Sequence, residues 1–125
     1  MRAVIKSGSF SWTATIMDSP TGRKIWEALP LKGRANRWGD EIYFSIPVQA
    51  ELEPGASDVV SKGDLGYWPP GKAFCIFFGT TPASRGDEVR AASPVNVFGR
   101  VEGPVDDLGR VRSGDEVTIE RESDD

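Results

Sequence analysis

Apolar and polar residues alternate with a period of two over much of this chain, which is the pattern of strands that bury one face. The clearest case is residues 10–16, where every second side chain is apolar and those between are serine or threonine. A shorter apolar run, residues 3–6, precedes it across Ser7-Gly8. The chain is therefore expected to open with a hairpin.

Residues 41–46 alternate in the same way, with apolar side chains at 42, 44 and 46 and Glu41 and Tyr43 on the opposite face. Gly39-Asp40 before them predicts a tight turn from a strand that ends near Trp38, because glycine tolerates a positive φ.

Residues 73–78 contain no polar side chain other than one thiol, so a central strand buried on both faces is expected there. Shorter strands are predicted at residues 64–68, 95–101 and 116–120. Residues 49–62 and 80–92 are predicted to be loops, with a helical turn near residues 58–61 in the first.

Two short helices are predicted. Asp18-Ser19-Pro20 supplies a cap followed by proline at the first helical position, and Pro30 ends this helix after about ten residues. Within residues 104–111, Val105, Leu108 and Val111 recur at helical spacing, which predicts the second helix.

The elements number about eight strands and two helices, without an internal repeat. Strands outnumber helices and most connections resemble hairpins, which argues against a parallel doubly wound sheet. We expect a mostly β fold, a closed eight-stranded antiparallel β-barrel capped by the two helices, because closure removes exposed strand edges. The chain of 125 residues suits one domain, residues 1–120, with an acidic ending, residues 121–125, that is expected to fray.

Charge and composition restrict the classes of binding partner and the cellular location that we expect. Fifteen basic and nineteen acidic residues give a net charge of −4, which argues against binding to nucleic acid or to an anionic membrane. No segment approaches the roughly 20 apolar residues that span a bilayer. The first six residues are too short an apolar stretch for a secretory signal, so a cytoplasmic location is expected.

The chemistry available to this chain is restricted. It has no histidine, which excludes serine–histidine and cysteine–histidine nucleophiles and zinc sites built on imidazole. Its single cysteine, Cys75, forbids an internal disulfide and lies in an apolar run, so it is expected to be a small buried side chain. The glycines form no phosphate-binding motif, and neither a metal nor a cofactor is predicted.

Two segments, residues 36–44 and 63–79, resemble the signatures of a family of small prokaryotic cyclophilin-like proteins, which are stand-alone domains of unassigned function. The string Gly-Tyr-Trp-Pro-Pro-Gly, residues 66–71, is the most specific part. The resemblance implies an eight-stranded cyclophilin-type barrel with two helices, in agreement with the pattern above.

The resemblance also raises the activity of true cyclophilins, which catalyse rotation about X-Pro bonds across a barrier of about 18–20 kcal/mol. Their site combines an apolar trough with an arginine that hydrogen-bonds the prolyl nitrogen. Here the Phe-His-Arg string that carries this arginine is missing, and residues 42–47 stand in its place. Ile76 stands where those enzymes carry glutamine. Arg37 could substitute for the arginine, although the sequence does not place it.

We expect a protein that binds a small molecule or an extended, proline-containing peptide in an aromatic-lined groove. The alternatives are a divergent prolyl isomerase and a scaffold whose aromatic face serves self-association, and the chain is expected to be a monomer or a weak homodimer. The catalytic residues are unknown. The candidate ligand-binding residues are Arg37, Trp38, Glu41, Tyr43, Tyr67, Trp68, Phe78 and Asn96.

Each candidate residue also has a purely structural interpretation. Arg37 and Glu41 could form a surface ion pair worth less than about 1 kcal/mol. The aromatic side chains could cover the barrel wall or plug one of its ends. Asn96 could be solvated, or its amide could hold neighbouring backbone if that side of the sheet is covered.

Overall fold

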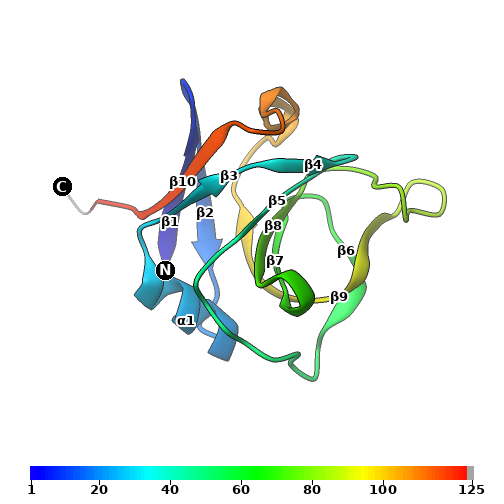
Figure 1. Ribbon diagram of the computed structural model, residues 1–125, viewed down its shortest axis with the longest axis horizontal. Coiled ribbons are helices and arrows are strands. Elements are labelled where there is room, and N and C mark those ends of the chain that lie inside the picture. Colours follow the sequence, from blue (N-terminus) through cyan, green and yellow to red (C-terminus); the bar gives the residue numbers. More distant parts are fainter. Residues whose placement is uncertain (124–125) are drawn as a thin grey trace.

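The structure is a computed structural model that describes residues 1–123, and this part of the chain is mostly β (Figure 1). It contains ten strands, one α-helix and two short 3₁₀ helices. The strands are β1 (Arg2–Ser7), β2 (Phe10–Ile16), β3 (Leu31–Arg34), β4 (Asn36–Trp38), β5 (Glu41–Ser45), β6 (Ser57–Val60), β7 (Asp64–Trp68), β8 (Ala73–Phe77), β9 (Val89–Val101) and β10 (Glu116–Arg121). The helices are α1 (Pro20–Ala28), η1 (Pro69–Gly71) and η2 (Asp106–Arg110).

The strands pair in the order β3-β10-β1-β2-β9-β7-β8-β5-β4, with β6 beside β9. The prediction of a closed eight-stranded barrel is therefore wrong: the described sheet has ten strands, and its two end strands, β3 and β4, do not pair with each other. These two strands are consecutive in the chain and only Ala35 separates them. The first and last strands of the sheet are therefore connected by the chain and not by hydrogen bonds between them. Figure 1 shows them following one another along the top of the curved sheet.

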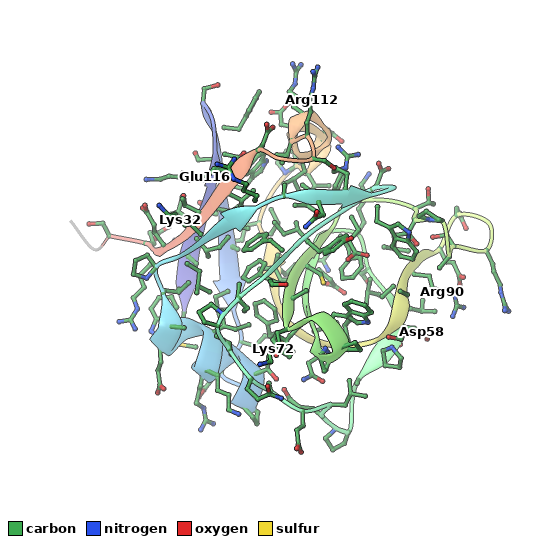
Figure 2. The ribbon with its side chains drawn as sticks, in the orientation of Figure 1. Lys32, Asp58, Lys72, Arg90, Arg112 and Glu116 are labelled. Atoms are coloured by element: carbon green, nitrogen blue, oxygen red, sulfur yellow. The ribbon has the colours of Figure 1, made fainter. Side chains whose placement is uncertain are left out.

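Two strands, β3 and β6, have no clear alternation of apolar residues and were not predicted. β6 lies where a helical turn was expected, near residues 58–61, and it is extended because it pairs with β9. The Arg90 guanidinium on β9 donates to the Asp58 carboxylate on β6 at 2.6 Å, and Figure 2 shows the two side chains together. Tertiary pairing, which local pattern does not reveal, sets the conformation of this segment.

The predicted first helix is confirmed as α1. Its N-cap, Ser19, accepts a hydrogen bond from the Gly22 amide at 3.0 Å, and its one fully buried apolar side chain is Ile25. The second predicted helix is the 3₁₀ helix η2, so the expectation of two capping helices is corrected to one α-helix with short 3₁₀ turns. The apolar positions 105, 108 and 111 recur every three residues, which is the repeat of a 3₁₀ helix.

The buried side chains form two clusters on the two faces of β8, which is buried along its whole length as predicted. Phe74 and Ile76 belong to the larger core, where the Phe74 ring stacks on Phe44 at 5.4 Å between centroids. The smaller core lies on the opposite face and consists of Ala73, Cys75, Phe77, Val89, Ala91 and Val95.

β9 closes the smaller core. It spans thirteen residues and pairs with β2, β6 and β7, although its first residues were expected to belong to the loop at residues 80–92. Its pairing with β7 shifts register between Leu65 and Gly66, which face Gly99 and Val97. Val95 and Asn96 are neighbours on opposite faces, and both are buried because Val95 lies in the smaller core while Asn96 bonds to the connection between β5 and β6.

The described end of the chain lies beside α1. Arg121, the first residue of the expected tail, is the last residue of β10, and its guanidinium donates to the Trp26 carbonyl at 2.9 Å. Residues 124 and 125 lie outside the described part of the structure, so the frayed acidic ending stays a prediction.

Candidate functional site

The turn between β4 and β5 sets two of the candidate residues side by side. Gly39 adopts a φ of 60°, as the expected turn requires, and Trp38 then pairs directly with Glu41 across the ladder. A side chain at position 39 would also meet the Thr80 carbonyl oxygen at 2.9 Å. Glycine at this position therefore fixes the geometry of the turn and the placement of both neighbours.

A cavity of about 250 Å³ opens beside this turn, over the smaller core. Its side chains come from β4, β5, β7 and β9, and four of the eight candidate residues line it. We refer to it as the aromatic cavity. It is lined by Trp38, Glu41, Tyr43, Trp68, Ala91, Ala92 and Val95.

The Trp68 ring is held in place from outside the cavity. Its indole N–H donates to the Ser93 hydroxyl on β9 at 2.6 Å. A ring fixed in this way offers its surface to a ligand with little rotational freedom left to lose.

Glu41 is the one charged residue of the aromatic cavity. It is 6% exposed, and burial raises the pKa of its carboxyl from the usual 4.5 to about 7, against the smaller lowering effect of a hydrogen bond with the Cys75 thiol. The pKa of that thiol is in turn well above its usual value, first because it is buried and second because Glu41 lies beside it. Glu41 therefore changes charge near neutral pH.

The surface ion pair that Arg37 and Glu41 could have formed is absent from the structure. Arg37 lies on the opposite face of β4, where its guanidinium donates to the carbonyls of Gly109 and Val111 at 3.1 and 2.8 Å. It pairs with the carboxylate of Asp40, not with that of Glu41. Arg37 thus ties β4 to the segment that contains η2.

Phe78 and Arg37 are together, but away from the aromatic cavity. The Arg37 guanidinium lies over the Phe78 ring at 5.0 Å from its centroid, and Phe78 is 7% exposed within the larger core. Such a contact between a cation and an aromatic ring stabilises the packing of this end of the sheet.

Tyr67 and Asn96 are buried and bonded to backbone. The Tyr67 hydroxyl donates to the Val48 carbonyl at 2.6 Å. The Asn96 side chain accepts from the Glu53 amide at 2.8 Å and donates to the Glu51 carbonyl at 2.8 Å. Both residues therefore hold the long connection between β5 and β6 against the sheet, in agreement with the structural interpretation of Asn96.

The sequence did not point to the β9 residues of the cavity, Ala91, Ala92 and Val95, as part of a site. Small apolar side chains carry no chemical signal, and two of these residues were expected in a loop. The apolar positions 89 and 91 are two residues apart, and this spacing was the one indication that β9 begins before residue 92.

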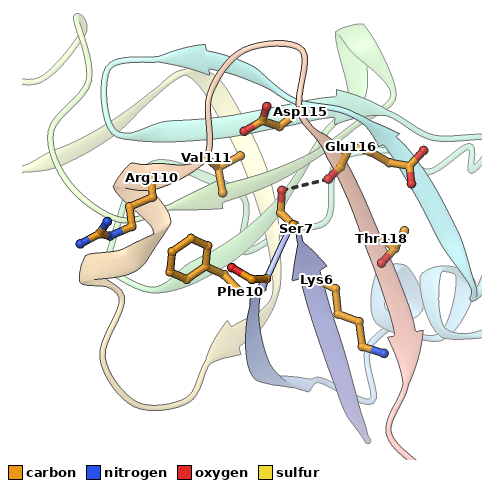
Figure 3. Close-up of a pocket in the computed structure, with 10 residues that line it drawn as sticks. Lys6, Ser7, Phe10, Arg110, Val111, Asp115, Glu116 and Thr118 are labelled. Carbon is orange, nitrogen blue, oxygen red and sulfur yellow. Dashed lines mark hydrogen bonds between the residues drawn. The ribbon is translucent and has the colours of Figure 1, made fainter.

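A second and wider cavity, of about 740 Å³, lies between the β1–β2 hairpin and the segment from η2 to β10 (Figure 3). Two of its polar side chains, Ser7 and Lys6, have partners within the protein. The Ser7 hydroxyl donates to the Glu116 carbonyl at 2.9 Å, and Lys6 pairs with Glu120. It contains no buried charge, so the aromatic cavity is the better candidate site.

Residues 1–123 contain neither a metal-binding group of side chains nor a membrane-spanning helix. No three acidic or cysteine side chains gather there in an arrangement that could hold a metal ion. Within the same residues, no helix has the length and apolar character needed to cross a membrane.

Comparison with known proteins places the chain in a family. No curated protein matches the sequence. Among solved structures, the chain is similar to a hypothetical protein from Archaeoglobus fulgidus whose structure was determined in solution, with 46% identity and a TM-score of 0.80 over 98% of this chain and 95% of the other. The family model described as cyclophilin-like matches residues 1–120. The resemblance inferred from the sequence is thereby confirmed, and the chain belongs to the cyclophilin-like family.

Proposed function

We propose that this protein binds a small molecule in the aromatic cavity. The observation that carries the proposal is the convergence of three aromatic side chains and one buried carboxyl, from three different strands, on one concave site. Ligand sites are typically concave, mostly apolar and equipped with a few polar groups that orient the ligand. Large aromatic side chains supply contact area at a small cost in side-chain entropy.

The size of the cavity favours a small molecule over an extended peptide. A volume of about 250 Å³ lies just below the range of roughly 300–1,000 Å³ that is common for drug-sized ligands. A peptide would place a single side chain in it. Tyr67 and Phe78 are not part of the proposed site, because both are buried in the larger core.

The position of Arg37 supports binding over prolyl isomerisation. An isomerase that used this arginine would need its guanidinium free to reach the nitrogen of a bound proline. Here it is engaged by three backbone carbonyls and Asp40, on the face of β4 away from the aromatic cavity. A coupled isomerase assay on a proline tetrapeptide tests this point: catalysis that is lost in Arg37→Ala would favour the enzyme.

The binding proposal is tested by a thermal-shift screen of small metabolites, repeated on two variants. Trp68→Ala removes one wall of the aromatic cavity, whereas Trp26→Ala removes a tryptophan on α1 outside it. We expect ligand-induced shifts to disappear in the first variant and to persist in the second. Shifts that survive in Trp68→Ala would refute the proposed site.

Self-association through the aromatic face is the remaining alternative, and sedimentation analysis separates it from ligand binding. A monomer, or a weak dimer unchanged in Trp68→Ala, agrees with the proposal. A dimer that dissociates in that variant would instead assign the aromatic face to an interface.

A further inference from the structure

Among the described residues, Glu41 is a buried carboxyl without a cation beside it. The aromatic cavity has no lysine or arginine in its lining, and within residues 1–123 no ion pair includes Glu41. The side chain beside it is the Cys75 thiol, a weak donor whose single proton also points to the Ala73 carbonyl, at 3.8 Å from the sulfur. An ionised carboxylate removed from water is costly unless a positive charge or strong donors compensate it. The cavity is therefore complementary to a ligand that brings a positive charge.

The other walls of the cavity favour the same charge. Trp38, Tyr43 and Trp68 contribute aromatic rings from β4, β5 and β7. The face of an aromatic ring carries partial negative charge, and it attracts a cation within about 6 Å of the ring centroid. The indole N–H of Trp68, which would repel a cation, is already bonded to Ser93.

The scarcity of hydrogen-bond acceptors narrows the class of cation. A primary ammonium has three N–H donors, and each needs an acceptor when it leaves water. The side chains that line the cavity offer the Glu41 carboxylate and the Tyr43 hydroxyl, while its β9 wall consists of alanine and valine. An ammonium whose hydrogens are replaced by methyl groups needs no acceptors and packs against apolar side chains.

Building on the proposed function, we infer that the ligand is a small molecule with a methylated ammonium group, which lies among Trp38, Tyr43 and Trp68 with its charge next to the Glu41 carboxylate. The cavity of about 250 Å³ accommodates such a group together with a short substituent.

The pH dependence of binding follows from the groups that face Glu41. These are the Cys75 thiol from β8 and the Tyr43 phenol on its own strand, and the lining from β4, β7 and β9 adds no titratable side chain. Cys75 stays protonated well above neutral pH. Affinity for a cation should therefore rise with the ionised fraction of Glu41 and fall roughly tenfold for each pH unit below about 7.

The experiment uses two probes of the same shape and different charge: choline, and its neutral isostere 3,3-dimethylbutan-1-ol. Two of the four tryptophans line the cavity, so their fluorescence reports binding directly. The titrations are made at about pH 8 and about pH 5.5 on the wild type, Glu41→Gln and Trp68→Ala. Glu120→Gln, which changes an exposed carboxylate paired with Lys6, is the matched control.

We expect choline to bind at least roughly tenfold more tightly than the isostere at the higher pH. This preference should fall in Glu41→Gln, where only the aromatic rings still favour the cation, and should stay unchanged in Glu120→Gln. The blocked amino acid N-acetyl-trimethyllysine amide distinguishes the source of the group: tighter binding than choline would assign the cavity to a modified side chain and overturn the small-molecule inference.

Two results would overturn the cationic class, and they differ in what they mean for the aromatic cavity. Equal binding of both probes, lost in Trp68→Ala, would keep the aromatic cavity as a binding site for neutral ligands. If neither probe changes the fluorescence, the inference of a cationic ligand is refuted. The thermal-shift screen of metabolites then tests separately whether the aromatic cavity binds any ligand. The comparison of the two probes needs no variant, so it stands even if a substitution impairs folding.

Discussion

Replacing Glu41 with glutamine should change how the stability of the protein depends on pH. In the folded state the carboxyl is 6% exposed and its pKa is raised to about 7, whereas in the unfolded chain it returns to about 4.5. The folded state therefore holds a proton that the unfolded state releases between these two values. The stabilisation from the protonated carboxyl is fully present below pH 4.5, and it is lost as the pH rises through about 7.

The size of this effect follows from the two pKa values. A difference between 4.5 and about 7, at about 1.4 kcal/mol for each unit, corresponds to a loss on the order of 3 kcal/mol in the free energy of unfolding. Glutamine has nearly the same shape and does not ionise. The variant should therefore gain on the order of 3 kcal/mol relative to the wild type between about pH 4.5 and about pH 8.

Urea unfolding of both proteins across this pH range, followed by tryptophan fluorescence, measures the difference. The new amide can add a constant difference between the unfolding free energies of the two proteins. The prediction concerns only how this difference changes with pH. Glu120→Gln, in which an exposed carboxylate is replaced, should track the wild type. A difference that does not change between about pH 5 and about pH 8 would refute the burial argument for Glu41.

Three further substitutions test the framework around the site. Asn96→Ala removes the amide that bonds to the Glu53 N–H and should cost about 2–3 kcal/mol in urea unfolding; a loss below about 0.5 kcal/mol would contradict its structural role. Gly39→Ala places a side chain at a φ of 60° and against backbone, so it should cost about 1–3 kcal/mol and shift the fluorescence of Trp38, and an unchanged spectrum would count against the strained turn. Tyr67→Phe should cost about 1 kcal/mol by thermal unfolding and leave ligand binding intact, whereas lost binding would return Tyr67 to the site.

Local patterns in the sequence predicted the elements that carry the site. The Gly39-Asp40 turn, the alternation on β5 and the doubly buried strand β8 all appear as expected, because each depends on residues close together in the chain. The candidate residues Trp38, Glu41, Tyr43 and Trp68 meet in one cavity. Whether they bind a ligand stays a prediction, as do the oligomeric state and the cytoplasmic location.

The sequence could not show which candidate residues face the cavity and which face the larger core, because this depends on how distant strands pack. Tyr67 and Trp68 are adjacent on β7, so their side chains point to opposite faces. The sequence does not say which face lies in the larger core and which beside the cavity; that choice follows from the course of β9. The burial of Glu41 has the same origin, since β9 covers a face that the pattern alone marks as polar.

Closure of the sheet was mispredicted for a related reason. Alternation identifies the faces of strands but not their partners, and the two short end strands, β3 and β4, join through Ala35 without pairing. The Ala35 amide instead donates to the Asp115 carbonyl at 2.8 Å, next to β10. A pairing between distant segments of this kind leaves no periodic signal in the sequence.

The unequal size of the two cores has a consequence for how fast backbone amides exchange with solvent. The smaller core has six buried members, three of them on β9, so we expect the amides of β6 and of the outer part of β9 to exchange with solvent sooner than those beside the larger core. Because Ala91, Ala92 and Val95 on β9 also line the aromatic cavity, a ligand bound there should slow this exchange.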